Sequence, residues 1–283
     1  MVKATKKWWP IFVLPTFAAF IIGFIVPFCE GLYLSFCKFT TINKAVWVGA
    51  SNYVKVFQDP QFFTSLGFTA VFTIFSTVRI NVFAFAVALA LTNNIKGTNV
   101  FRTIFFMPNL IGGIVLGYIW NILFNCLLSL LAKPLLALNI TAGFWGMIVL
   151  MCWQQIGYMM IIYIAGLQSI PTDYIEAARI DGATANQILF KIKIPNVMPS
   201  VTICTFLTLT NSFKLYDQNL ALTNGRPYNG AIHTTEMLAL NIVNSNTLKT
   251  KGVGQAKAVM FFVLVAIIGI FQMKSTHDKE VQQ

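Results

Sequence analysis

Apolar residues along this chain occur in long blocks that are separated by short polar segments. Six blocks reach or approach the roughly 20 residues that a helix needs to cross the hydrocarbon of a bilayer. They cover residues 8–36, 64–91, 103–124, 144–167, 197–222 and 253–273. Because a helix satisfies its own backbone hydrogen bonds in hydrocarbon, each block predicts a membrane-spanning helix. The pattern therefore predicts an all-α membrane protein with six transmembrane helices in a single domain, residues 1–283.

Basic residues at the edges of the blocks predict the orientation of the chain. Lys3, Lys6 and Lys7 precede the first block, which is longer than the apolar region of a secretory signal, so we expect a retained first span. Cations are denser in the short segments that then share the side of the N-terminus, which favours a cytoplasmic location for both termini. Lys257 and Lys274 bound the charge-free core of the sixth block, and we expect both to extend their side chains to the interfaces.

Composition supports a membrane location and excludes other classes of protein. Hydrophobic residues make up 57% of the chain, charged residues make up 10%, and the mean hydropathy is +0.70, which argues against a water-soluble enzyme. The net charge of +11 is explained by cations that flank the spans, and we expect no nucleic-acid partner. The five cysteines and two histidines are scattered, so we expect neither a metal site nor catalysis.

The polar segment between the fourth and fifth blocks has the pattern of a helix outside the membrane. Thr172 or Asp173 can cap a helix after Pro171, and Pro195 ends the helical potential further on. The sequence predicts a helix over residues 172–190, which either lies at the interface as an ordinary amphipathic helix or offers a face to another protein.

A specific motif falls in this segment. Glu176-Ala177-Ala178 is followed after three residues by Gly182, and after nine more by Ile192-Lys193-Ile194-Pro195. The spacing resembles the EAA signature of membrane permease subunits of ATP-binding-cassette (ABC) importers, with Ile194 where the family usually has Leu. The resemblance implies a type I ABC importer permease fold, in which a cytoplasmic coupling helix docks on an ATPase. The residues that it implies in coupling are Glu176, Ala177, Ala178, Asp181, Gly182, Ile192 and Pro195.

Further matches along most of the chain resemble the carbohydrate-uptake branch of this family. They include Asn52-Tyr53, Phe57-Gln58-Asp59-Pro60, Met107-Pro108, Phe213-Lys214 and Thr223-Asn224-Gly225, whereas Arg226 replaces a usual glycine. The resemblance implies one half of an oligosaccharide import pathway in a prokaryotic plasma membrane. The implied partners are a second homologous permease, a cytoplasmic ABC ATPase dimer and an extracytoplasmic solute-binding protein.

ATP is expected to bind elsewhere, because the chain lacks the G-x-x-x-x-G-K-[ST] phosphate-binding loop. We therefore expect no cofactor in this chain, with ATP and Mg²⁺ held by the partner ATPase.

The family resemblance also implies a substrate pathway. The positions that line it in relatives fall at Trp153 and Tyr158 in the fourth span and at Thr208, Asn211 and Ser212 in the fifth. The tryptophan offers a face for a sugar ring and the asparagine offers groups for sugar hydroxyls. Packing against lipid or hydrogen bonding between helices remains the alternative. Arg79, inside the second span, is costly in a bilayer unless it is paired or faces water, so we expect a functional or partner-contact role.

Two other transport functions compete with this reading. An importer of the same architecture for an amino acid or another nutrient remains open on composition. A cation-coupled secondary carrier is disfavoured, because no Asp or Glu falls at the centre of an expected span.

Overall fold

The computed structural model describes residue 11 and residues 13–93, 96–136, 139–223, 228–229, 232–233, 235–246 and 250–277. Residues 8–10 of the first expected span, and Asn224, Gly225 and Arg226 of the family match, lie outside the described residues. The chain divides into two compact units, Met1–Phe62 with Ile242–Val263 and Phe63–Asn241 with Leu264–Gln283.

The first unit contains the first span and the segment that follows it. Its elements are the π-helix η1 (Ile21–Ile25), α2 (Val26–Ser35), β1 (Cys37–Lys38), the 3₁₀-helix η2 (Ile42–Lys44), β2 (Val46–Trp47) and α3 (Ser51–Phe57). Strands β1 and β2 pair antiparallel, with Cys37 opposite Trp47. The Asn52 amide donates to the carbonyls of Ser35 at 2.8 Å and Cys37 at 3.0 Å, and so fixes α3 against the end of the span.

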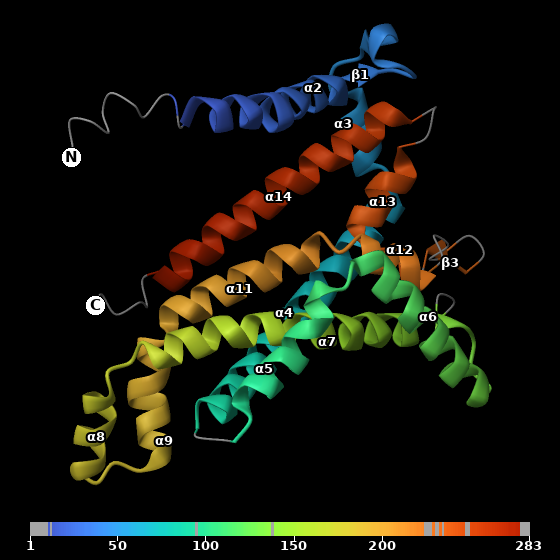
Figure 1. Cartoon of the computed structure of the whole chain (residues 1–283). Helices are drawn as coiled ribbons and strands as arrows, with labels where there is room; N and C mark the ends of the chain where they lie inside the picture. Colours follow the sequence, from blue (N-terminus) through green and yellow to red (C-terminus); the bar gives the residue numbers. More distant parts are fainter. Residues whose placement is uncertain are drawn as a thin grey trace. The chain divides into compact units, whose positions relative to one another are not determined.

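The second unit contains most of the remaining elements (Figure 1). They are α5 (Thr98–Phe106), the 3₁₀-helix η3 (Met107–Leu110), α6 (Gly113–Leu130), α7 (Ile140–Gln168), α8 (Thr172–Ile180), α9 (Ala185–Ile188), the π-helix η5 (Leu189–Lys193), α10 (Ile194–Asn196), α11 (Met198–Phe213), α12 (Asp217–Thr223), β3 (Tyr228–Asn229) and β4 (Ile232–His233), the last two paired antiparallel. Three helices contribute residues to both units: α4 (Pro60–Thr92), α13 (Leu238–Ser245) and α14 (Lys251–His277).

Five described helical segments are long and apolar enough to cross a membrane. They are Val13–Ser35, Pro60–Thr92, Gly113–Leu130, Ile140–Gln168 and Lys251–Lys274. The pair Ala185–Asn196 and Met198–Phe213 qualifies as a sixth span if it is counted as one span with a bend of 67°. The described part of the chain is therefore a helical membrane protein with five or six spans.

Helix α7 is the central helix of the second unit. In its most apolar window 61% of the residues are buried, against 28% in α4 and 17% in α6. The ring of Phe144 meets Phe68, Phe72 and Phe75 of α4 edge to face, with ring centres 5.8–6.2 Å apart. Gly157 lies so close to α5 that a Cβ there would overlap the Phe105 carbonyl group. Small and aromatic side chains thus bring neighbouring helices directly against α7.

The third and fifth expected spans differ from the helices that form. The block 103–124 is divided, because α5 ends at Phe106, Met107–Leu110 form a 3₁₀ turn with Pro108 near its start, and α6 begins only at Gly113. The block 197–222 is divided as well, since α11 ends at Phe213 and α12 starts at Asp217. Proline lacks the backbone donor that a continuous helix needs, which accounts for the first interruption.

Candidate functional site: an exposed helical hairpin and a polar cavity

The segment expected as one helix over 172–190 forms two short helices instead. Helix α8 ends at Ile180, and Gly182 follows with a left-handed φ of +77°. The Ala183 N–H donates to the Ala178 carbonyl at 2.9 Å, and the Gly182 N–H donates to Arg179 at 3.1 Å. These two bonds form a Schellman motif, in which glycine is favoured because the left-handed conformation is strained for other residues. Gly182 therefore ends the first helix.

A capping box starts the second helix two residues later. The Thr184 hydroxyl accepts a bond from the Gln187 N–H at 3.3 Å, and the Gln187 side-chain oxygen accepts from the Thr184 N–H at 2.7 Å. Helices α8 and α9 thus form a hairpin, which projects beyond the ends of α7 and α11 in Figure 1. This hairpin comprises residues 172–188.

The residues of the EAA match are distributed between the hairpin surface and its base. Glu176, Ala177, Asp181 and Gly182 are exposed, whereas Ala178 is half-buried. No residue of α8 is buried. The apolar side chain of Ile180 is 85% exposed at the tip of the hairpin. The surface of the hairpin therefore carries both charge and an exposed apolar side chain.

Ile192 and Pro195 lie in the helical segment that returns from the hairpin, and both are half-buried. Ile192 belongs to η5, and Pro195 stands near the start of α10, directly after that wider turn. The change in helical geometry accommodates the missing donor of the proline. The bend of 67° follows immediately, between Asn196 and Met198.

Two of the expected pathway residues form a polar seam between α11 and α4. The Thr208 hydroxyl accepts a bond from the Asn81 amide at 2.9 Å, and the Ser212 and Ser76 hydroxyls are 2.9 Å apart. The Tyr163 hydroxyl of α7 donates to the Asn81 carbonyl oxygen at 2.7 Å. Thr208 and Ser212 are fully buried. In this conformation both residues join helices rather than line an open space.

Asn211, in contrast, lines a polar cavity of about 260 Å³ beside the break between α11 and α12. The cavity is lined by Met151, Gln155, Asn211, Lys214, Leu215, Tyr216, Asp217 and Gln218. The Gln155 side-chain oxygen is buried without a hydrogen-bond partner in the described structure. A buried oxygen without a partner has lost its hydrogen bonds to water and has gained none in the protein. It can therefore accept a hydrogen bond from a ligand in this cavity.

The aromatic residues expected in the pathway do not line this cavity. Trp153 lies two residues from both Met151 and Gln155, which places it on nearly the opposite face of α7 at about 100° per residue. It is 43% exposed and meets the Trp120 ring edge-on, with centres 5.6 Å apart. Tyr158 is half-buried against the apolar core. The structure therefore brings Asn211 together with Gln155, not with Trp153.

The positions of Gln155 and Gln218 at this cavity, and of Gln154 beside it, were not expected from the sequence. The Gln218 amide donates to Gln154 at 2.7 Å, and the Gln154 amide reaches the Ile111 carbonyl at 3.3 Å. The available signal was the pair of adjacent glutamines, Gln154 and Gln155, inside an apolar span. Polar side chains inside an apolar span usually bond between helices or line a polar cavity; here Gln154 bonds between helices and Gln155 lines the cavity.

Comparison with known proteins assigns the chain to a family. The family model described as "Binding-protein-dependent transport system inner membrane component" matches residues 80–274. The chain belongs to this family. It is a transport permease of the inner membrane and not an enzyme, and its membership agrees with the helical spans described above.

Curated relatives match this permease over nearly its whole length. The probable starch degradation products transport system permease protein AmyD of Thermoanaerobacterium thermosulfurigenes is 41% identical, over 97% of this chain and 96% of the relative. The multiple sugar-binding transport system permease protein MsmF of Streptococcus mutans is 30% identical, over 98% of this chain and 97% of the relative.

Solved structures show that the permease has the fold of ABC importer subunits. A chain of a bacterial ABC transporter involved in the import of the acidic polysaccharide alginate superposes with a TM-score of 0.81 at 20% identity, covering 98% of both chains. A chain of the MetNI methionine transporter gives 0.55 at 18% identity, covering 78% of the permease and 97% of that chain. Because importers of unrelated substrates share it, the fold alone does not identify what is carried.

Arg79 of the permease lies over aromatic rings. Its guanidinium carbon is 4.4 Å from the centre of the Trp145 ring and 5.9 Å from that of Phe75. Within the described residues no carboxylate pairs with it. A cation over an aromatic face recovers part of the free energy that hydration provides in water. Its expected functional or partner-contact role stays a prediction.

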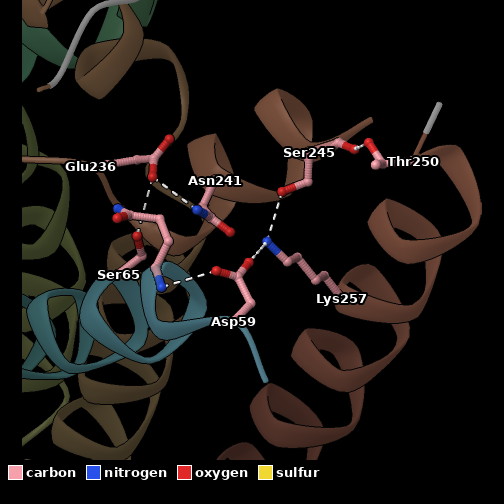
Figure 2. Close-up of polar contacts among 8 residues, drawn as sticks. Asp59, Ser65, Glu236, Asn241, Ser245, Thr250 and Lys257 are labelled. Atoms are coloured by element: carbon pink, nitrogen blue, oxygen red, sulfur yellow. Dashed lines mark hydrogen bonds and ion pairs between the residues drawn. The ribbon is translucent and has the colours of Figure 1, made fainter. Parts of the chain in front are cut away.

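Figure 2 shows an ion pair in the first unit of the permease that the sequence did not reveal. The Lys257 ammonium is 2.6 Å from the Asp59 carboxylate and donates to the Ser245 hydroxyl at 2.7 Å. Lys257 is only 2% exposed, so the expectation that it extends to the membrane interface is wrong. The attraction of the nearby carboxylate offsets part of the desolvation cost of burying the ammonium, and the pair connects the start of α4 to α14.

A buried carboxylate lies in the second unit. The Glu236 side chain accepts bonds from the Asn241 amide at 2.8 Å and the Ser65 hydroxyl at 3.3 Å (Figure 2), and it is 2% exposed. The neighbouring segment is held by Asn219, which bonds the backbone of Thr235 and Met237. Glu236 therefore belongs to a network that fixes the segment before α13.

Titratable side chains do not gather into a metal site in the part of the permease that the structure describes. No group of three or more His, Cys, Asp or Glu residues lies close enough to hold an ion there.

Proposed function

We propose that the permease forms one half of the membrane pathway of an ATP-driven importer for an oligosaccharide. The observation that carries this proposal is the 41% identity, over 97% of the chain, to a permease named for starch degradation products. The match to a multiple sugar-binding permease over 98% of the chain supports the same substrate class.

Energy would enter through the hairpin. The exposed Glu176, Asp181 and Ile180 give the hairpin both charge and an apolar tip, and its base runs directly into the bent helix that leads to α11. A displacement of the hairpin by a docked ATPase would therefore be transmitted to the helix that carries Asn211. Rigid helical elements are the usual means of transmitting such movements.

The proposed assembly contains a second homologous permease, a cytoplasmic ABC ATPase dimer and an extracytoplasmic solute-binding protein. Family membership supports the last partner, because the family is described as binding-protein-dependent. A structure of the alginate transporter was determined in complex with a periplasmic protein bound to an alginate pentasaccharide. Both termini and the hairpin would lie in the cytoplasm, as the distribution of cations favours.

The substrate would pass the polar cavity beside α11. Asn211 and the unpartnered Gln155 oxygen suit hydroxyl groups, and one cation and one anion, Lys214 and Asp217, balance the formal charge of the lining. This balance favours a neutral sugar. Trp153, Tyr158, Thr208 and Ser212 remain proposed pathway residues, of which the last two would be reached after the seam to α4 opens.

Sugar uptake by cells that lack the gene, complemented with variants, tests the proposal. We expect Glu176→Lys to abolish uptake of a labelled maltooligosaccharide at unchanged protein level in the membrane, because it reverses the charge on the docking face. Gln168→Lys, which adds a cation at the exposed end of α7 outside the EAA match, should transport normally. Normal uptake by Glu176→Lys would refute coupling through the hairpin, and uptake of an amino acid but no sugar would refute the substrate class.

A further inference from the structure

A second cavity, of about 410 Å³, lies between the end of α4 and the base of the hairpin. Its charged and polar lining comes from Arg179, Lys193, Asn93 and Asn186, and its apolar lining includes Leu89 and Ile188. All of these residues belong to the second unit. The cavity is distinct from the polar cavity beside Asn211.

The charge of this cavity is of one sign. Two of its described lining residues are cationic and none is acidic. The described structure records no hydrogen bond or ion pair for the side chain of Arg179 or of Lys193. Two like charges at one cavity repel each other, and an anion with several acceptor oxygens relieves this repulsion while it accepts their hydrogen bonds. The lining therefore selects an anion, and the two side-chain amides add donors.

The apolar part of the lining shows what kind of anion fits. Leu89 lies one turn before the end of α4 at Thr92, and α4 is long and apolar enough to span a membrane. Ile188, on α9, lines the same cavity as the cations. A free inorganic anion or a carboxylate side chain would use only the cationic and polar part of this lining, whereas an amphiphile contacts both parts.

We propose that this cavity binds the phosphate headgroup of an anionic phospholipid of the membrane. Arg179 and Lys193 would bind the phosphate oxygens, and Leu89 and Ile188 would contact the start of the acyl chains. Basic pockets between helices at the cytoplasmic surface are suited to such headgroups. The lipid would connect the base of the hairpin to the bilayer. The proposal does not depend on the identity of the transported substrate.

Lipid retention by the full chain, purified in detergent and delipidated, tests this proposal. The chain is incubated with mixed micelles of phosphatidylglycerol and phosphatidylcholine and repurified, and bound lipid is quantified by mass spectrometry. We expect the native chain to retain phosphatidylglycerol selectively. The double variant Arg179→Gln/Lys193→Gln should retain at most about one tenth as much phosphatidylglycerol, because it loses two charge-assisted contacts.

Two further variants keep the test independent of folding defects. Lys191→Gln removes an exposed cation only two residues from Lys193 that does not line the cavity, and it should retain the native amount. Asn93→Asp keeps both cations but adds an anion to the lining, and it should weaken retention. Equal retention of phosphatidylglycerol by all variants would overturn the proposal. Binding of inorganic phosphate as tightly as the lipid would overturn the lipid assignment.

Discussion

At the scale of single residues, the proposed binding role of the polar cavity depends on one side chain whose oxygen has no hydrogen-bond partner among the described residues. Gln155 has a buried oxygen without a partner in the described structure, and Asn211 lines the same cavity from α11. A buried polar atom of this kind lowers stability unless a ligand or water pairs with it, which agrees with the proposed place of the cavity on the substrate pathway.

Replacing this glutamine should separate transport from stability. Gln155→Leu removes the unpartnered oxygen, so we expect an unchanged or slightly higher melting temperature, together with a KM for sugar uptake raised about tenfold by the loss of one buried hydrogen bond. Gln168→Leu, at an exposed position, is the control for uptake. A lower melting temperature with an unchanged KM would show that Gln155 has a structural role only.

The close approach at Gly157 gives a second prediction at this scale. Gly157→Ala places a methyl group where the Phe105 backbone lies, and overpacking of this kind costs about 1–3 kcal/mol. Gly67→Ala in α4, where a Cβ meets nothing within 4 Å, should be neutral or stabilising, since alanine favours helix. Thermal unfolding of both purified variants measures the difference, and equal melting temperatures would contradict the close packing of α5 on α7.

Among single residues, the sequence named Asn211 for the pathway, which stays a prediction, and indicated neither the role of Gln155 nor the burial of Lys257. Asn211 was found by counting along a family resemblance. Gln155 depends on which face of α7 meets the break after Phe213, and the burial of Lys257 depends on Asp59, nearly 200 positions away in the chain. Neither relation is visible in local periodicity, because each is created by packing between helices.

At the scale of elements, the hairpin shows how far a local pattern is informative. The sequence predicted helix over 172–190, and helix occupies much of it, but Gly182 and Thr184 divide the segment. Both signals were present, as a glycine after a helical run and as the capping pair Thr184 and Gln187. Pro108 and the Gly112-Gly113 pair likewise divide the third block.

Substitution of Gly182 tests whether the turn sets the hairpin. Gly182→Val forces a β-branched side chain into the left-handed conformation and should destabilise the turn by about 1–2 kcal/mol, whereas Gly182→Asn should be tolerated far better. Hydrogen exchange of the α8 amides measures the effect. Equal exchange in the two variants would contradict the Schellman geometry.

At the scale of the whole molecule, the apolar blocks were sufficient to predict a helical membrane protein with six spans. The structure describes five qualifying helices and a bent pair, and the family comparison places the chain among inner-membrane permeases. Hydropathy predicts the spans because each segment in hydrocarbon must form its own backbone hydrogen bonds, and a helix does this. It carries no information on where a span bends or which faces meet a second subunit, since lipid and a partner helix are both apolar environments.

The central claim is that the hairpin receives energy from a separate ATPase, and photocrosslinking from its exposed tip tests this most directly. A photoreactive residue at Ile180, incorporated in cells that express the complete transporter, should form an adduct with a cytoplasmic ATPase. The same photoreactive residue at Leu130, which is exposed at the C-terminal end of α6, should form no ATPase adduct. Absence of an ATPase adduct at Ile180, or labelling of a cysteine there by a membrane-impermeant reagent from outside the cell, would contradict the account.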